Sequence, residues 1–471
     1  MKKNRNLFRS PMFKHGPIGS AILIALTTTA VAQTSAPPPV SISTQGAPAS
    51  SSIQNDLLAF LENVTPYGTV DIGVAHLSHG APLSGYYSAG VPYLITKASN
   101  TAITTVAPSG LSQSKVGLSG SEPVGGGVSV VFKLETGFSP TSGNLVDGQK
   151  SLVLNNGKAL AEQTTAGDSA RAGQIFQGAA FAGVSSKLYG TLTFGRQTGP
   201  QQDAIAQYDP QQQANAFSPI GYSGVAAGAG ATEDTRFDSS IKYSVATGPM
   251  RVTVLHQFGS TGEIQAGADA VDIGADYAGL SVDGTYTKVS DAITATSLNA
   301  AQALLNPGTL GATVSDDRAA ALQAKYNTGK VIVYAGYEHI VFANPAHPLS
   351  APAANIGGYL LSVLNQTAYI EHRILEIAWT GVRYTVIPKL DLSAAYYHYD
   401  QNSYKGNGCT NASASSCSGT LNAGSLVVDY RFTKRLDAYA GVMYSNVGNG
   451  LSAGYLNSAE FTQMVGGRFS F

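Results

Sequence analysis

Apolar and polar residues alternate along the last segment of the chain. In 465–471, VGGRFSF, one parity ends in Phe469 and Phe471, whereas the other carries Arg468 and Ser470. This period of two is typical of a β-strand. Soluble strands rarely end on an aromatic residue because termini fray, but a terminal Phe suits the interfacial girdle of a transmembrane barrel. The pattern predicts an all-β, transmembrane antiparallel β-barrel, with Phe469 and Phe471 as a membrane-interface and assembly signal.

The same alternation recurs upstream and predicts about sixteen strands. Short turns alternate with long, polar connections, which places the short turns in the periplasm and the long loops outside. An even number of strands leaves both ends of the barrel chain in the periplasm. Before the last strand, the predicted strands are Val64–Leu77, Lys115–Ser121, Val128–Phe138, Ile175–Val184, Thr191–Arg196, Arg236–Val245, Arg251–Phe258, Ala268–Tyr277, Ser281–Val289, Ala320–Tyr326, Val331–Phe342, Ile374–Val386, Leu390–Tyr404, Leu421–Phe432 and Leu436–Val447.

The N-terminal segment has the pattern of a cleaved export signal. A basic start precedes the short apolar run Ile18–Ala30 and the A-x-A site Ala30–Ala32. The run is too short to span a bilayer as a helix, which argues against a membrane anchor. We therefore predict a signal peptide over 1–32, a Pro/Ser-rich extension over 33–63 and a barrel over 64–471. The basic residues of the signal are Lys2, Lys3, Arg5, Arg9 and Lys14.

The composition supports strands that face lipid on one side and a polar lumen on the other. Only 12% of residues are charged, and the chain holds 53 Gly and 24 Tyr. A large soluble β-protein is the alternative interpretation. Without the five basic residues of the signal, the 28 basic residues fall to 23 against 29 acidic ones, a balance of −6. This argues against a nucleic-acid partner.

Three segments resemble the general porins of β-proteobacterial outer membranes. They are GLSGSEPVGGGVSVVFKLETGF (Gly117–Phe138), AFAGVSSKLYGTLTFGRQ (Ala180–Gln197) and the terminal RFSF. The resemblance implies a sixteen-stranded homotrimer in the outer membrane, surrounded by lipid and lipopolysaccharide and inserted by the barrel-assembly machinery. It also implies passive uptake of small hydrophilic solutes and ions, with the third external loop, Gln197–Asp234, folded into the lumen as the constriction. The 33–63 extension departs from the family pattern.

Charges arranged at a constriction set which solutes pass, because a narrow opening focuses their field. Arg or Lys on the lipid face near the midplane would cost about 2–4 kcal/mol, so charged strand residues are expected to face inward. Arg196 has outward parity, and only a bulge would turn it inward. On the folded-in loop we expect Asp203 and Asp209 to oppose the basic wall, with Glu233 and Asp234 at its exit. The alternative is that these charges are solvated or locally paired. By parity, the inward residues are Lys115, Lys133, Glu135, Arg236, Asp238, Lys242 and Arg468.

Cys409 and Cys417 are the two cysteines, and both lie in a Gly/Ser/Asn-rich segment. In an exported protein this spacing favours one local disulfide in a loop. A metal site would need further ligands, and the nearest histidine is His398. The histidines form no Ser/His/Asp constellation, so we expect no enzyme activity, cofactor or metal. Two other functions stay open: a substrate-specific channel, and a barrel that serves as an adhesin or surface receptor.

Overall fold

The computed structural model describes residues 63–87, 100–167, 171–220, 236–259, 267–350, 352–405 and 414–471. The chain divides into two units, 1–55 and 56–471, and every described residue belongs to the second. The predicted signal peptide, and the predicted extension up to residue 62, lie outside the described residues. No helix in the described part of the chain is long and apolar enough to cross a membrane.

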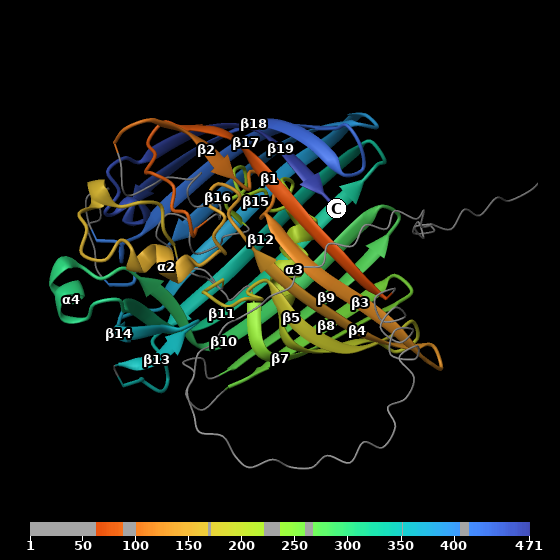
Figure 1. Cartoon of the computed structure of the whole chain (residues 1–471), viewed down its shortest axis with the longest axis horizontal. Helices are drawn as coiled ribbons and strands as arrows, with labels where there is room; N and C mark the ends of the chain where they lie inside the picture. Colours follow the sequence, from red (N-terminus) through yellow and green to blue (C-terminus); the bar gives the residue numbers. More distant parts are fainter. Residues whose placement is uncertain are drawn as a thin grey trace, which may run out of the picture. The chain divides into compact units, whose positions relative to one another are not determined.

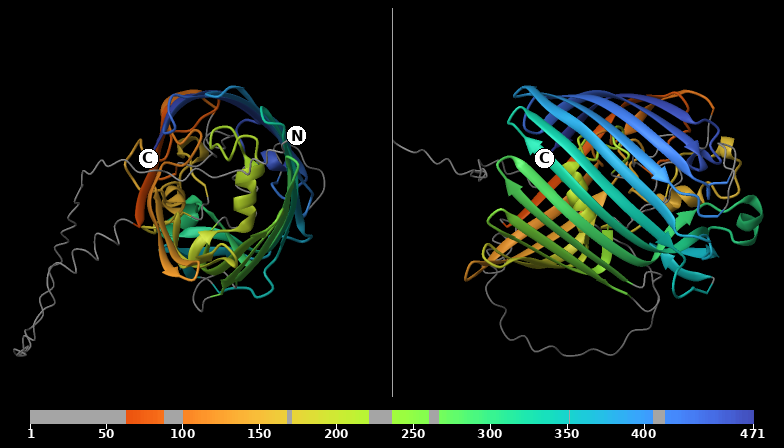
Figure 2. Two further views of the ribbon diagram at one scale, coloured as in Figure 1. Left: turned by 90° about the vertical axis from the view of Figure 1, so that its right-hand side faces the viewer. Right: turned by 180° about the vertical axis from the view of Figure 1, so that it is seen from behind.

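One sheet of nineteen strands forms the second unit, and its first and last strands pair with each other. When the short strands β2, β13 and β14 are set aside, sixteen antiparallel strands remain in a closed ring (Figures 1 and 2). The predicted fold class is thereby confirmed. The ring strands are β1 Val64–Leu77, β3 Lys115–Gly125, β4 Val128–Gly137, β5 Ala179–Ser186, β6 Gly190–Thr198, β7 Arg236–Thr247, β8 Met250–Phe258, β9 Gly267–Tyr277, β10 Leu280–Thr296, β11 Leu310–Asn327, β12 Val331–Ala343, β15 Arg373–Ile387, β16 Leu390–Gln401, β17 Gly419–Arg431, β18 Leu436–Asn449 and β19 Ala459–Ser470.

The ring closes where β1 meets β19. Their register runs from Thr69 opposite Ser470 to Leu77 opposite Thr462. Beyond it, Gly68 and Phe471 exchange two backbone hydrogen bonds of 3.1 and 3.0 Å. Closure satisfies the backbone groups that lipid cannot, so the last residue of the chain completes the wall.

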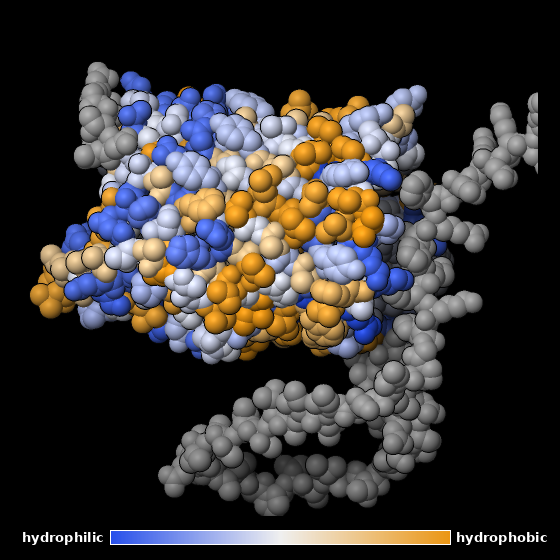
Figure 3. Space-filling model, turned by 90° about the horizontal axis from the view of Figure 1, so that it is seen from above, coloured by the Kyte–Doolittle hydropathy of each residue, from blue (hydrophilic) through white to orange (hydrophobic). Residues whose placement is uncertain are grey.

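Apolar side chains cover the outside of the ring. They gather in a broad band over the strands on the face drawn in Figure 3. Phe469 and Phe471 belong to this outer surface: their rings stack at 6.1 Å between centroids, and they are 46% and 47% exposed. The aromatic pair thus lies at the short-turn end of the wall, and its position at the membrane interface stays a prediction.

The wall position beside β1 is shared by two strands. Residues 72–77 of β1 pair with β2 (Ile103–Pro108), whereas residues 64–69 pair with β3. Between these strands the chain leaves the sheet at 109–114. The buried Asp71 carboxylate accepts hydrogen bonds from the backbone N–H groups of Gly110, Leu111 and Ser112 at 3.1, 2.9 and 2.8 Å. Asp71 thus supplies the acceptors that a neighbouring strand would otherwise provide.

The external side carries elements that the sequence reading had assigned to loops. They are β2, β13 (Ala353–Ile356), β14 (Tyr359–Asn365), α2 (Gly148–Val153) and α4 (Ala300–Leu305). β14 pairs in parallel with the start of β11, and Leu152 of α2 packs in one buried cluster with Leu310 and Leu361. β10 and β11 are longer than predicted, and β5 begins at Ala179 rather than Ile175. Of these external elements, α2 and β14 therefore pack on the long-loop end of β11.

Replacing Phe471 by Ala is expected to weaken closure of the ring. About half of the Phe471 phenyl group is covered by the protein, so its loss should lower the free energy of unfolding by about 1–2 kcal/mol. The measurement is the temperature midpoint at which refolded protein changes its mobility in gel electrophoresis (heat-modifiability). Phe432→Ala is the matched control, because Phe432 is 51% exposed and packs on Tyr430 away from the closing strands. Equal midpoints for the two variants would contradict a role of Phe471 in closure.

Candidate functional site

The third external loop turns into the barrel directly after β6. Gly199 precedes the helix α3 (Pro200–Tyr208), and Pro200 occupies its first turn, where a missing N–H costs nothing. Figure 2 shows α3 inside the ring of strands. Ala204, Ile205 and Tyr208 are buried. We call the described part of this loop, residues 199–220, the inner loop.

Asp209 anchors the inner loop where α3 ends. Its carboxylate is fully buried and accepts hydrogen bonds from the backbone N–H groups of Gln211 and Gln213, at 3.1 and 2.7 Å, and from the Tyr397 hydroxyl at 2.6 Å. Burial raises the pKa of Asp209, and hydrogen bonds such as that from Tyr397 oppose the shift. The expectation that Asp209 faces the pore is wrong, because its neighbours cover it completely.

Beyond Asp209 the inner loop continues along the opposite wall. Trp379 on β15 donates to the carbonyl of Tyr208 at 3.1 Å. Phe217 packs edge-on against Tyr439 of β18, with centroids 6.3 Å apart. Ala216 donates to the carbonyl of Gly110 at 2.9 Å, in the excursion held by Asp71. The inner loop is thus fixed at several points from β15 to the β2–β3 break.

Lys115 and Lys133 share one carboxylate on the β3–β4 wall. Their Nζ atoms lie 3.0 and 3.5 Å from Glu135 Oε2, and Arg171 approaches Glu135 Oε1 at 3.6 Å. Tyr67 also donates to Glu135, at 3.0 Å. The lysine side chains are 34% and 36% exposed, whereas Glu135 is 5% exposed. Solvent therefore meets the two ammonium groups rather than the acid between them.

A bulge brings Arg196 inward. The register of β6 and β7 shifts between Gly195 and Gln197, with Gly195 at φ 125° and Ser239 at φ 48°. Arg196 consequently has an exposed fraction of 9% and pairs with Asp238 at 2.5 Å. The bulge that would turn Arg196 inward against its strand parity is therefore present.

The remaining predicted charges also have local partners. Lys242 forms an ion pair with Asp203, which ties α3 to β7. Arg236 donates to the carbonyl of Gly178 at 2.9 Å, and Arg468 pairs with Asp437 at 2.8 Å. Glu233 and Asp234 lie outside the described residues.

Two arginines in ion pairs inside the barrel were not among the residues predicted from the sequence. Arg251 on β8 lies 2.5 Å from both Asp276 and Asp283, and it donates to the Tyr208 hydroxyl at 2.6 Å. Strand parity alone would have placed Arg251 inside. Arg171 lies in a loop, where no period predicts direction.

Comparison with known proteins identifies the family. A sequence profile described as Gram-negative porin matches residues 19–450. The chain belongs to this family. An outer membrane porin protein of Bordetella pertussis is 26% identical over 181 residues, and the match spans 38% of each chain. The porin is thus an outer-membrane protein.

Solved structures share the fold at low identity. An anion-selective porin from Comamonas acidovorans superposes with a TM-score of 0.56 and 17% identity, over 87% of this chain and 99% of that chain. The outer-membrane-expressed OmpT of Vibrio cholerae gives 0.53 and 15%, over 87% and 97%. Likeness at this level concerns the barrel architecture.

The porin's cysteines are partly described. Cys417 is disulfide-bonded, and Cys409 lies outside the described residues. The pairing of these two cysteines stays a prediction. Within the described ranges, no group of three His, Cys, Asp or Glu side chains has the geometry to hold a metal ion.

Tyr397→Phe should loosen the inner loop of the porin. It removes one donor from a buried carboxylate, at a cost of about 1–3 kcal/mol. We expect more current noise in the open single channel and a lower heat-modifiability midpoint. Tyr396→Phe is the control, because Tyr396 is the preceding residue on β16 and is 48% exposed on the outer face. Identical noise in both variants would rule out the Tyr397–Asp209 anchor.

Proposed function

We propose that this porin is a passive outer-membrane channel for small hydrophilic solutes and ions, narrowed by its inner loop. The observation that carries the proposal is the position of residues 199–220 inside the ring, anchored through Asp209 and Phe217. A loop fixed inside the lumen narrows the channel without closing it. Family membership favours a channel over an enzyme.

We further propose that Lys115 and Lys133 favour anions at the narrow part. Two lysines, with side chains 34% and 36% exposed, share the buried carboxylate of Glu135, so the group leaves positive charge toward solvent. A narrow opening with low-dielectric walls strengthens the effect of such charge on passing ions. The Comamonas relative is described as anion-selective, which agrees with this assignment.

We propose a homotrimer in a membrane of lipid and lipopolysaccharide, with the terminal strand recognised by the barrel-assembly machinery. One similar structure, OmpT of Vibrio cholerae, is described in a trimer form and has a TM-score of 0.52. The exposed aromatic pair Phe469 and Phe471 supplies the C-terminal signal. Cys409 and Cys417 would close an external loop.

Replacing both Lys115 and Lys133 by Glu should move the reversal potential toward cation preference. The change reverses the charge that solvent meets next to Glu135. It is measured with purified protein in a planar bilayer under a salt gradient. The matched control is Lys330→Glu with Lys434→Glu, because both residues are exposed in short turns. An unchanged reversal potential in the first variant would remove these lysines from the constriction.

Diffusion of solutes should follow their size. In liposome swelling, rates for uncharged sugars should fall steadily with molecular mass and rise linearly with concentration. Saturation with one sugar would instead favour a substrate-specific channel. No swelling from heat-modifiable protein would favour a closed barrel that acts as an adhesin or receptor.

A further inference from the structure

The helix α3 turns one face to the wall and the other to the lumen. On the wall face, the Gln201 side chain donates to Glu338 at 3.0 Å and accepts from the Thr285 hydroxyl. Gln202 and Gln207 lie on the other face, where Gln202 is half-buried and Gln207 is exposed. Because α3 lies inside the ring (Figure 2), a side chain exposed on it meets the water of the lumen.

The turn after α3 presents two further glutamines. Gln212 is exposed and Gln213 is half-buried. Both have left-handed backbones, with φ 55° and 60°, which residues other than glycine rarely adopt. The Asp209 carboxylate holds the turn through the N–H of Gln213, and the Gln213 side chain donates to the carbonyl of Gln202 at 3.3 Å. Strain of this kind collects at functional sites, and here it places two amides beside those of α3. We call Gln202, Gln207, Gln212 and Gln213 the amide row.

The acids of the inner loop leave the amide row uncharged. Asp203 pairs with Lys242 and also accepts from the Thr198 hydroxyl at 2.7 Å. Asp209 is fully buried. A solute beside the row therefore meets neutral amides, which neither attract nor repel it by charge.

Most amides of the row are available to a solute. Among the residues that the structure describes, the side chains of Gln202, Gln207 and Gln212 make no hydrogen bond. The inner loop is fixed to β7, β15 and β18, so the row faces away from these strands. The left view of Figure 2 shows the orange strands β3 and β4 across the ring from α3.

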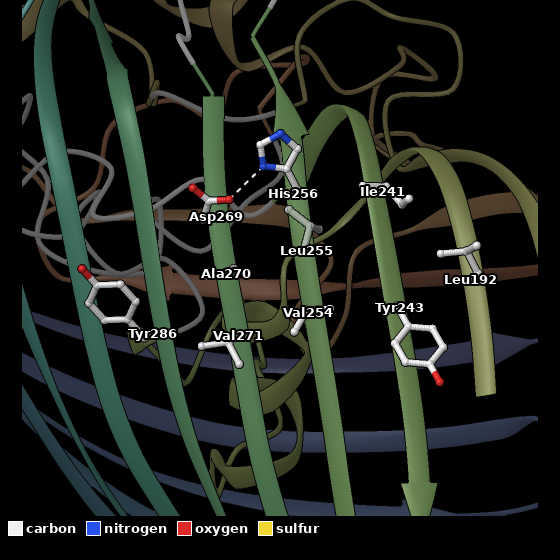
Figure 4. A pocket seen from close by; sticks show the side chains of 10 residues that line it. All are labelled: Leu192, Ile241, Tyr243, Val254, Leu255, His256, Asp269, Ala270, Val271 and Tyr286. Carbon is white, nitrogen blue, oxygen red and sulfur yellow. Dashed lines mark hydrogen bonds and ion pairs between the residues drawn. The ribbon is translucent and has the colours of Figure 1, made fainter. Parts of the chain in front are cut away.

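The outer wall offers a polar solute no comparable surface. On β6 to β10 it carries an apolar groove of about 400 Å³. Figure 4 shows Tyr243 and Tyr286 on the flanks of this groove, with Val254 and Val271 between them. The unpaired amides thus belong to the water-filled side of the wall.

We propose that the amide row binds neutral polyhydroxylated solutes, such as sugars and sugar alcohols, as they pass the inner loop. A glutamine amide has two donors and one acceptor, and a hydroxyl group both donates and accepts. Neighbouring hydroxyls can therefore exchange hydrogen bonds with water for hydrogen bonds with the row. The net gain per hydrogen bond is small, so the solute is released again. This inference rests on the proposed channel function.

Liposome swelling with purified, refolded mature protein tests the proposal. The probes are xylitol and triethylene glycol, which have nearly the same molecular mass. Xylitol carries a hydroxyl on every carbon, whereas triethylene glycol has hydroxyls only at its ends and ether oxygens between them, which cannot donate. After subtraction of the rates in protein-free liposomes, xylitol should enter about threefold faster, the effect of a single net hydrogen bond.

Gln202→Leu with Gln207→Leu should bring the ratio of the two rates to about one, because it removes two amides from the row. Leucine favours helix, so α3 is retained, and heat-modifiability shows that the variant is folded. The matched control is Gln463→Leu, because Gln463 is exposed on the outer face of β19. The control should keep the ratio of the wild type.

Equal rates for the two probes in the wild type would overturn the proposal, and so would an unchanged ratio in Gln202→Leu with Gln207→Leu. In both cases swelling itself would leave the channel standing. No swelling with either probe from folded wild-type protein would contradict the channel, and the amide row as a solute site with it. The row is uncharged, so the double variant should also keep the reversal potential of the wild type under a salt gradient, which separates this proposal from that for Lys115 and Lys133.

Discussion

A backbone that crosses lipid has to pair all its N–H and C=O groups within the protein, and the rest of this molecule depends on that constraint. Sixteen antiparallel strands meet it by closing β1 on β19, down to the exchange between Gly68 and Phe471. The break in the wall between β2 and β3 shows the same constraint. There a buried carboxylate, Asp71, takes over the role of a neighbouring strand.

The interrupted wall also helps to hold the inner loop. Asp71 accepts from the Tyr439 hydroxyl at 2.6 Å, and the Tyr439 ring packs against Phe217 of the inner loop. A second buried carboxylate, Asp209, holds the middle of the same segment, where α3 ends. Two acids therefore serve as structural acceptors, whereas Glu135 on the β3–β4 wall pairs with Lys115 and Lys133.

The sequence predicted most where the period of two is strict. Sixteen strands and the β1 bounds of Val64–Leu77 followed from it, because each ring strand has one face toward lipid. The period fails where loops cover both faces: Ile293 and Val314 are buried on the outer extensions of β10 and β11, so these extensions were missed. β2 was missed because the break between β2 and β3 is held by hydrogen bonds to Asp71, which lies about forty residues earlier in the chain.

The period of two predicts neither bulges nor burial. Lys242 reaches Asp203, and Arg196 turns inward through its bulge, as strand geometry allows. Asp209 was expected to face the pore, because no local pattern reveals Tyr397, which lies 188 residues away and covers it. Partners so distant in sequence are brought together only by the closed ring.

Single-channel conductance tests the central claim most directly. Purified mature protein would be compared in a planar bilayer with a variant whose residues 200–220 are replaced by a short Gly/Ser linker. For the wild type, a trimeric channel predicts ohmic steps that close in threes. If the inner loop is the constriction, the variant should give larger steps. Steps of equal size, or no steps from folded wild-type protein, would contradict it.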